Sequence, residues 1–372
     1  MNKNQQTGNP FRRISYISPI SEIVSVSFKK TTGIRRKSSK KRQTREEKIA
    51  EAEKERISVL SLEMTNRLDR IVNQFPWIND IHPFYFELCN LIGNVDKIKR
   101  VLGRLGGISQ KIKDIEREQL IKLYQTEHPL EMAQIRRETG GRFASLIKKA
   151  EGDVKYLIRI VKKLKTIPDF NVLLPTIVIA GAPNVGKSSL VREISSGIPE
   201  VGEYPFTTKQ VVFGHREQGF MKIQIVDTPG ILDRPIRERS MIERQSIATI
   251  RYVSDIIVFM FDVSKDAAIP LNEQLNLIEE ITNEFPDTPI IKVLNKIDLI
   301  TEKEQDNISR DLDIEFPISL KNITGIKELT EKLEEITKKI IKESEKFRHA
   351  FDISISEEYL PVDKDKEIDY EI

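Results

Sequence analysis

The chain has 372 residues and a formal net charge of +3, with 39% hydrophobic and 31% charged residues. This composition is that of a globular protein, and the length predicts two or three domains. No apolar run approaches the roughly 20 residues of a membrane span, so we expect no membrane partner. The single cysteine, Cys89, excludes an internal disulfide, and we expect a cytoplasmic protein.

Residues 1–45 are predicted to form a basic N-terminal arm. Nine basic residues and no acidic residue occur between positions 29 and 45: Lys29, Lys30, Arg35, Arg36, Lys37, Lys40, Lys41, Arg42 and Arg45. Such a cluster suits the phosphate backbone of RNA, and basic arms often become ordered only on RNA. A solvated arm is the alternative. An anionic membrane is a third option, but no apolar helix face accompanies the cluster.

Residues 46–167 are predicted to form an antiparallel bundle of about four helices, because apolar residues recur at three- and four-residue steps. We expect a helix to begin after Gly106-Gly107 and the stretch from Met132 to Leu164 to be interrupted at Gly140-Gly141. The aromatic residues of this segment are expected in the core rather than in a base-stacking platform: Trp77, Phe84, Tyr85 and Phe86. Three arginines are read either as a basic ridge or as a plain exposed face: Arg136, Arg137 and Arg142.

Residues 168–346 alternate between strand-like and helix-like segments. This alternation predicts an α/β domain with a mostly parallel sheet and helices on both faces, preceded by the all-α bundle. Lys209–His215 and Met221–Val226 are expected to form a hairpin within the sheet. Residues 347–372 are read as an acidic, disordered tail, since Asp352–Ile372 contains eight acidic residues and two lysines.

The run from Gly181 to Ser188 fits G-x-x-x-x-G-K-[ST], the phosphate-binding P-loop, and lies between a strand-like run and a helix start. In this motif backbone N–H groups surround phosphate oxygens, the lysine reaches the β- and γ-phosphates, and the serine hydroxyl ligates Mg²⁺. We therefore assign phosphate contacts to Asn184, Val185, Gly186, Lys187, Ser188 and Ser189.

The guanine-selective element is Asn295-Lys296-Ile297-Asp298, which follows another strand-like run. The Asp298 carboxylate accepts two hydrogen bonds from guanine that adenine cannot donate, so we expect GTP and GDP as ligands. Asn295 is expected to hold the base-binding loop against the P-loop, and Lys296 to lie along the ring. The backbone at Ser319-Leu320 is assigned to the guanine oxygen, although many GTPases have alanine in place of Leu320. A chance surface turn is the alternative reading of the motif.

Two further segments are predicted to respond to the γ-phosphate. Asp227, in Asp227-Thr228-Pro229-Gly230, is expected to hold Mg²⁺ through a water, and the Gly230 N–H to contact the γ-phosphate. Thr208 is expected to close on Mg²⁺ and the γ-phosphate, with Thr207 as the alternative. The catalytic set is then Lys187, Thr208 and Gly230, and the Mg²⁺ set is Ser188, Thr208 and Asp227.

Ile231 stands where many small GTPases have a glutamine that orients the attacking water. Because isoleucine cannot hydrogen-bond water, we expect slow intrinsic GTP hydrolysis, raised by a partner or a cation. Asn184 is a candidate for K⁺ binding near the bridge between the β- and γ-phosphates, as in several GTPases with asparagine at this position. The alternative is that Asn184 only shapes the loop.

The chain resembles the nucleolar GTP-binding protein 1 family, in the short archaeal-type form. The resemblance rests on Pro183–Arg192, Tyr204–Lys209 and Asp227–Pro235, and it extends to Asn9-Pro10-Phe11 and to Ile135–Arg142 in the N-terminal half. It implies an Obg-related GTPase that associates with the large ribosomal subunit or its precursor.

From these features we expect a monomeric GTPase that hydrolyses GTP to GDP and phosphate and acts as a switch in large-subunit biogenesis. Its partners would be rRNA and ribosomal proteins. An assembly placeholder with incidental hydrolysis and a regulator on mature ribosomes are the alternative functions.

Overall fold

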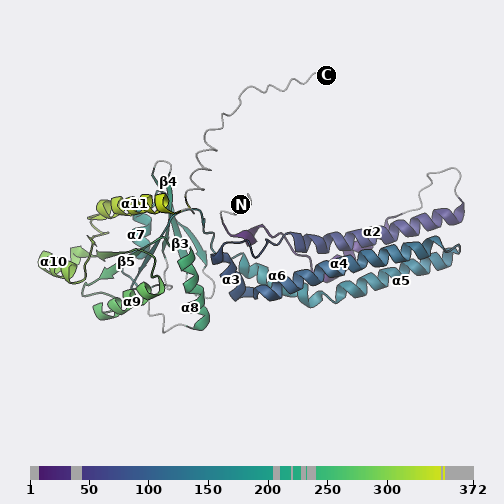
Figure 1. Ribbon diagram of the computed structural model, residues 1–372, viewed down its shortest axis with the longest axis horizontal. Coiled ribbons are helices and arrows are strands. Elements are labelled where there is room, and N and C mark those ends of the chain that lie inside the picture. The colour runs from purple at the N-terminus through teal and green to yellow at the C-terminus, as the bar shows by residue number, and fades with distance from the viewer. Residues whose placement is uncertain are drawn as a thin grey trace, which may run out of the picture. The chain divides into compact units, whose positions relative to one another are not determined.

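The computed structural model describes residues 8–34, 44–203, 210–218, 221–227, 232, 240–344 and 347. They divide into two compact units, one of Asn9–Lys165 and the other containing Gly8 and the chain from Thr166 onward (Figure 1). The first unit is all-α and the second is α/β, as the sequence predicts. Within the described residues, no helix is long and apolar enough to cross a membrane.

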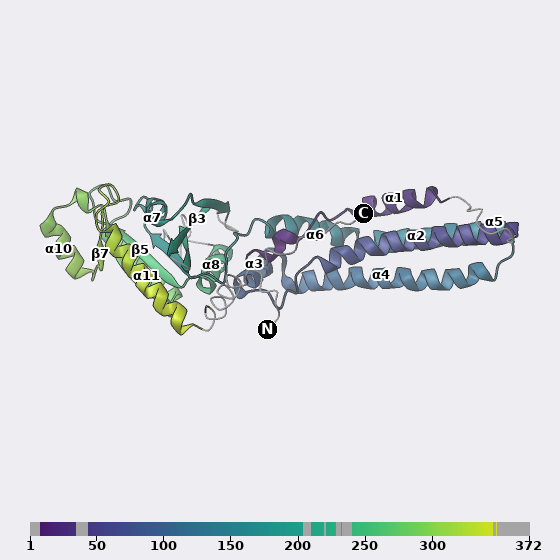
Figure 2. The ribbon, with the colours of Figure 1, turned by 90° about the horizontal axis from the view of Figure 1, so that it is seen from above.

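The helical unit is built around three long helices, α2, α4 and α5, which pack on one another (Figure 1). Figure 2 shows α2 running alongside α4. α2 begins with a capping box at Thr44 and Glu47, in which the side chain of each residue accepts a hydrogen bond from the backbone N–H of the other. The helix α1 packs on α2 and α5, and α3 packs on α4 and α6. The elements of this unit are η1 (Pro10–Arg13), α1 (Ile20–Thr32), α2 (Arg45–Asn73), α3 (Pro83–Gly93), α4 (Val95–Tyr124), α5 (Pro129–Lys148) and α6 (Glu151–Leu164).

The helical unit begins earlier in the chain than the expected boundary at residue 46. Phe11, Ile14 and Ile23 are fully buried, and the Asn9 side-chain amide donates to the Leu164 carbonyl oxygen at 3.0 Å. Apolar burial therefore holds residues 9–34 in this unit, although the sequence analysis placed them in a separate basic arm.

Two glycine pairs lie inside continuous helices, contrary to expectation. α4 passes through Gly106-Gly107 and α5 passes through Gly140-Gly141, and the break between helices falls at Lys149-Ala150 instead. Each interior glycine costs about 1 kcal/mol relative to alanine, which the packing of a long apolar face outweighs.

The aromatic segment is only partly in the core. Phe84 and Tyr85 are buried and meet edge to face, with ring centroids 5.0 Å apart. Phe86 is half-buried. Trp77 is 85% exposed, so its assignment to the core was wrong. It lies in the turn between α2 and α3, where no helix face fixes the direction of its side chain.

The α/β unit contains a seven-stranded sheet in the order β2-β3-β4-β1-β5-β6-β7. β3 is antiparallel to β2 and to β4, which confirms the hairpin, and the other neighbouring pairs are parallel. The strands are β1 (Thr176–Gly181), β2 (Glu200–Glu203), β3 (Gln210–Gln218), β4 (Met221–Asp227), β5 (Ile256–Asp262), β6 (Ile290–Asn295) and β7 (Phe316–Pro317).

Helices cover both faces of this sheet (Figure 1). α7 and α11 bury Leu190 and Leu329 against β1 and β5, and α9 packs on the opposite face. β1 and β5 are buried along their whole length, as central parallel strands with two covered faces must be. The remaining elements are α7 (Lys187–Ile194), α8 (Met241–Ala248), η3 (Thr249–Tyr252), α9 (Leu271–Glu284), η4 (Ile297–Leu299), α10 (Glu302–Asp311) and α11 (Ile326–Glu343).

Candidate nucleotide-binding site

The predicted site residues lie at the carboxyl ends of neighbouring parallel strands. In the register of the sheet, Ile179 of β1 is level with Asp227 of β4, and Asp262 of β5 is level with Asn295 of β6. β1 lies between β4 and β5. The chain first adds β2, β3 and β4 on one side of β1 and then crosses to add β5, β6 and β7 on the other side, so the strand order reverses at β1. Ligands of open α/β sheets bind at this kind of position.

The loop from Gly181 to Gly186 adopts a conformation that its glycines permit. Gly186 has a φ of 107° and precedes the first residue of α7, and Gly181 has a φ of 134°. A Cβ at Gly186 would lie 2.5 Å from Asn295 Nδ2, and one at Gly181 would lie 2.4 Å from the Met260 carbonyl oxygen. Asn184 also has a positive φ, 61°, which asparagine tolerates better than most residues. The loop therefore presents backbone N–H groups at a helix N-terminus, where anions bind.

Lys187 and Ser188 face the interior of this loop. Lys187 is 6% exposed, and its ammonium donates to the carbonyl oxygens of Gly181 and Ala182 at 2.9 and 2.8 Å. Ser188 Oγ donates to Asp227 Oδ2, and Asp227 is fully buried. A hydroxyl and a carboxylate at one point supply the hard oxygen donors that Mg²⁺ prefers. These residues therefore fit the magnesium ion that the P-loop implies.

Asn295 connects the P-loop to the loop that follows β7. Its Nδ2 donates to the Val185 carbonyl oxygen at 2.7 Å, and its Oδ1 accepts from the Leu320 N–H at 3.3 Å. Beside it, Ser319 Oγ donates to Asp298 Oδ1 at 2.7 Å and so orients that carboxylate. The structure thus brings the P-loop, Asp298 and the Ser319-Leu320 backbone into a single cluster.

Lys296 is held by residues to which the sequence analysis gave no role. Its Nζ lies 2.5 Å from Asp262 Oδ2, and Asp262 is 2% exposed. The fully buried Gln274 of α9 accepts from the Asp262 N–H at 3.0 Å and donates to the Asp262 carbonyl oxygen at 2.6 Å. Ser264 N–H also donates to Asp262 Oδ1 at 2.9 Å. The available sequence signal was an acidic residue at the end of an apolar strand, the pattern that identified Asp227.

Several predicted residues lie outside the described part of the chain. These are Thr207, Thr208, Gly230 and Ile231 of the γ-phosphate segments, and Arg35, Arg36, Lys37, Lys40, Lys41 and Arg42 of the basic arm. Leu232 is described, and its carbonyl oxygen accepts from the Gly181 N–H at 3.1 Å. The backbone directly after Ile231 therefore meets the first residue of the P-loop motif.

The described residues of the basic arm belong to the helical unit. Lys29 and Lys30 lie in the last turn of α1, and Arg45 begins α2. Lys30 Nζ lies 2.5 Å from a Glu63 carboxylate oxygen. Among the three arginines of the proposed ridge, Arg136 Nε lies 2.5 Å from Glu53, and Arg142 lies 3.7 Å from Glu118.

Two family models match the two units in turn. Residues 11–171 match the NOG1 N-terminal helical domain, and residues 176–296 match a 50S ribosome-binding GTPase.

Similar proteins come from eukaryotes and archaea. Nucleolar GTP-binding protein 1 of Drosophila melanogaster is 33% identical over 64% of this chain, which spans only 37% of that protein. An uncharacterized protein of Methanocaldococcus jannaschii is 30% identical over 79% of this chain and 83% of its own length. The crystal structure of a candidate nucleolar GTP-binding protein 1 from Plasmodium falciparum is 28% identical and covers 50% of this chain and 93% of that chain, with a TM-score of 0.39.

Proposed function

Because the chain belongs to the nucleolar GTP-binding protein 1 family and carries a P-loop GTPase domain, we propose that GTP hydrolysis switches its binding to the large ribosomal subunit or a precursor. The observation that carries this proposal is the Asn295 link between the P-loop and the guanine-selective loop. Asn295 contacts the phosphate-binding loop through Val185 and the base-binding segment through Leu320. Loss of either contact would therefore disturb both segments.

Guanine selection is assigned to Asp298. Its Oδ1 already accepts from Ser319 Oγ at 2.7 Å, which fixes the plane of the carboxylate. A fixed carboxylate pairs with the N1–H and the exocyclic amine of guanine and leaves adenine with an unsatisfied acceptor. The Lys296 stem is proposed to cover the base, with its ammonium held by Asp262.

Phosphate binding is assigned to Lys187 and to the N–H groups at the start of α7. Lys187 Nζ now bonds to two loop carbonyl oxygens, and we propose that it exchanges these for β- and γ-phosphate oxygens. Ser188 and Asp227 are proposed to hold Mg²⁺, directly and through a water. When bound, Mg²⁺ neutralises charge on the phosphate oxygens.

The hydrolytic step is proposed to be slow without help. Ile231 offers no hydrogen bond to an attacking water, so positioning depends on other groups. Asn184 of the P-loop has a positive φ and is exposed. We propose that this side chain helps to bind K⁺, which then supplies positive charge beside the phosphates.

The switch itself is proposed to involve Thr208, or Thr207, together with Gly230. The Gly181 N–H bond to the Leu232 carbonyl oxygen links the P-loop to the segment that contains Gly230. A change at the γ-phosphate can alter affinity for a partner only if the partner binds the two nucleotide states differently. We propose that the GTP state is the one that holds the ribosomal particle.

The ribosomal partner is proposed from the family and from the charge of the N-terminal half. The Drosophila melanogaster relative is named a nucleolar GTP-binding protein, and the second family model is described as ribosome-binding. The run of nine basic residues from Lys29 to Arg45 supplies charge that suits rRNA phosphates. We propose a monomer in the cytoplasm that contacts both rRNA and ribosomal proteins.

Co-sedimentation tests this proposal. The full chain is mixed with mature large subunits or with precursor particles, in a non-hydrolysable GTP analogue or in GDP, at two salt concentrations, because phosphate contacts weaken steeply with salt. We expect stronger binding with the GTP analogue and a preference for precursors. Equal binding in both nucleotides would refute the switch, and a preference for mature subunits would favour a regulator of translation.

A Lys187→Ala variant separates the switch from a passive placeholder. We expect the variant to lose nucleotide-dependent binding to particles while it remains folded. The matched control is Lys222→Ala, which removes an exposed lysine of the same domain. If folded Lys187→Ala still supported assembly of the large subunit, hydrolysis would be incidental.

A further inference from the structure

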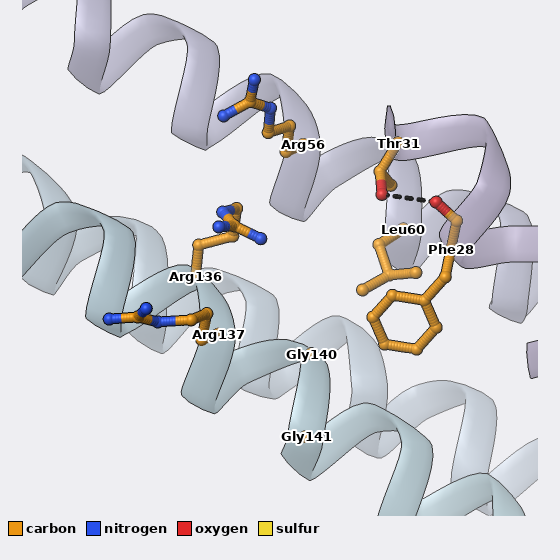
Figure 3. A pocket seen from close by; sticks show the side chains of 8 residues that line it. All are labelled: Phe28, Thr31, Arg56, Leu60, Arg136, Arg137, Gly140 and Gly141. Atoms are coloured by element: carbon orange, nitrogen blue, oxygen red, sulfur yellow. Dashed lines mark hydrogen bonds between the residues drawn. The ribbon is translucent and has the colours of Figure 1, made fainter. Parts of the chain in front are cut away.

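A cavity in the helical unit combines three guanidinium groups with an aromatic ring. It lies between α1, α2 and α5 and is lined by Phe28, Thr31, Arg56, Leu60, Arg136, Arg137, Gly140 and Gly141 (Figure 3). Its volume of about 220 Å³ is several times the roughly 30 Å³ of a water molecule. A ligand larger than water can therefore occupy it.

The charge of this cavity is positive. Buried Glu53 is the carboxylate within ion-pair distance, and it lies 2.6 Å from Arg56 Nη1 and 2.5 Å from Arg136 Nε. Glu53 accepts a hydrogen bond from Arg56 and forms an ion pair with Arg136, and it neutralises one of the three positive charges. Arg137 is exposed and makes no hydrogen bond or ion pair with a described residue. Guanidinium groups that are held in place and in excess of their acids are suited to phosphate.

The opposite side of the cavity is apolar and flat. Phe28 is 36% exposed, and its ring lies beside Leu60 in Figure 3. A Cβ at Gly140 would lie 3.2 Å from the Phe28 ring, so glycine lets the ring approach the α5 backbone. Gly141 also lines the cavity, and a Cβ there would meet nothing within 4 Å.

We propose that this cavity binds one nucleotide of single-stranded RNA, with its phosphate on Arg137 and Arg136 and its base against Phe28. Bases of single strands can leave the stack and lie on an aromatic ring, whereas those of a duplex cannot. The described lysines of the basic run, Lys29 and Lys30, belong to α1, which lines one side of the cavity. Arg56 Nη2 donates to the Ile34 carbonyl oxygen at 3.1 Å, so the cavity lies beside the chain that follows α1.

This inference deepens the proposed function, on which it rests for RNA as the partner. It adds a defined contact to a general positive charge. The competing explanation is that Glu53, Arg56 and Arg136 are only a structural ion-pair cluster of the helical unit. Arg137, Gly141 and the Phe28 ring lie outside that ion-pair cluster, so they decide between the two explanations.

The test measures binding of the full chain to a labelled RNA single strand of about ten nucleotides and to a hairpin duplex, by fluorescence anisotropy at two salt concentrations. Arg137→Gln is expected to weaken single-strand binding at least about fivefold and to lower the salt slope by about one. The control Arg117→Gln removes an equal charge from an exposed arginine of α4 that pairs with Asp114. Equal effects of the two changes would overturn the proposal.

Two further variants guard against loss of the fold. Phe28→Leu keeps an apolar side chain and is expected to weaken single-strand binding at least about fivefold without changing duplex binding. Gly141→Ala fits the structure and favours the helix, so it should fold at least as stably as wild type yet bind the single strand less well. Gly106→Ala is the matched control, because its Cβ would also meet nothing within 4 Å and it lies outside the cavity.

The results also separate this inference from the proposed function. If wild type binds ribosomal particles but the cavity variants bind the RNA strand normally, the cavity assignment fails alone. If the variants lose RNA binding while wild type ignores ribosomal particles in both nucleotides, the proposed ribosomal function fails alone. Competition by AMP at micromolar concentration would overturn RNA as the occupant and indicate a free nucleotide instead. Absence of wild-type binding to the single strand would also overturn the proposal.

Discussion

The side-chain amide of Asn295 donates to the carbonyl oxygen of Val185 at 2.7 Å, across 110 positions of the sequence. The same side chain accepts from the Leu320 N–H at 3.3 Å and is 3% exposed. The P-loop and the loop that follows β7 are therefore both bonded to Asn295, the first residue of the guanine-selective element. The geometry of each loop depends on this buried side chain.

Asn295→Ala is expected to lower both stability and nucleotide affinity. It leaves the Val185 carbonyl oxygen buried without this donor, which costs about 1–3 kcal/mol. We expect a similar loss in affinity for GTP and for GDP, because the change affects the loops and not the γ-phosphate. Denaturant unfolding and titration with a fluorescent nucleotide measure the two quantities.

The control for this prediction is Asn322→Ala. Asn322 is exposed, and its backbone N–H, rather than its side chain, donates to Ser319 Oγ at 3.2 Å. An Asn295→Ala protein that bound both nucleotides normally would contradict the proposed coupling between the loops.

Asp298→Asn is expected to change which base the site accepts. An amide presents one acceptor and one donor where the carboxylate presents two acceptors, so it opposes a donor of guanine with its own N–H group. We expect GTP affinity to fall by about 10²-fold or more. Xanthine carries an oxygen in place of the guanine amine, so xanthosine triphosphate should bind the variant better than GTP does. Competition titrations with GTP, ATP and xanthosine triphosphate measure this order, and an unchanged order would exclude Asp298 from the base contact.

Asp262→Asn is expected to release Lys296 from its fixed position. In this variant Lys296 Nζ loses the negative charge that lies 2.5 Å away on Asp262 Oδ2. The amide oxygen of the new asparagine can still accept from the Ser264 N–H. We expect nucleotide affinity to fall by about tenfold with a smaller loss of stability, because Lys296 can reach water. Asp266→Asn, an exposed neighbour, is the control. Equal nucleotide affinity in the two variants would show that Asp262 has no part in placing Lys296.

The strands and the site loops could be predicted from sequence because their signals are local. An apolar run that ends in a motif fixes both a buried strand and the edge at which its next residue lies, as for Asp227 and Asn295. Asp262 matches this pattern too, but the pattern does not indicate that it pairs with Lys296. Gln274 holds the Asp262 backbone through hydrogen bonds between segments, and no spacing within either segment indicates that contact.

The helical unit shows where local signals are overruled. Gly106-Gly107 and Gly140-Gly141 weaken a helix by local propensity, yet tertiary packing carries α4 and α5 through them. The basic run that begins at residue 29 likewise suggests a separate arm, but burial of Phe11 and Ile23 places residues 9–34 in the helical unit. The basic residues of this segment lie on its surface, and its buried apolar residues are what hold it in the helical unit.

Potassium is expected to raise the rate of GTP hydrolysis. Asn184 of the P-loop has a φ of 61° and is exposed, and the Ile231 side chain has no group that can orient water. We expect faster turnover in KCl than in NaCl at equal ionic strength, and we expect Asn184→Gly to remove the difference. Glycine tolerates the positive φ, so this variant keeps the loop while it deletes the amide. Equal turnover of wild type in the two salts would refute the potassium site.

The buried thiol of Cys89 is expected to make the helical unit less stable at alkaline pH. Burial raises the pKa of Cys89 from 9.0 to about 12, so between these values the unfolded chain loses this proton before the folded chain does. Because the unfolded state then binds fewer protons, stability falls as pH rises, by at most about 1.4 kcal/mol per pH unit from this group.

Urea unfolding of wild type and Cys89→Ala at about pH 8 and pH 10 measures the difference. Burial raises the pKa of Tyr156, and the charge of the Cys89 thiolate raises it further, so Tyr156 contributes to both curves and contributes less in the alanine variant. The alanine variant should have the lower stability at pH 8 because of the cavity it leaves, and the gap should narrow at pH 10. Curves that stay parallel would show that the thiol does not ionise on unfolding.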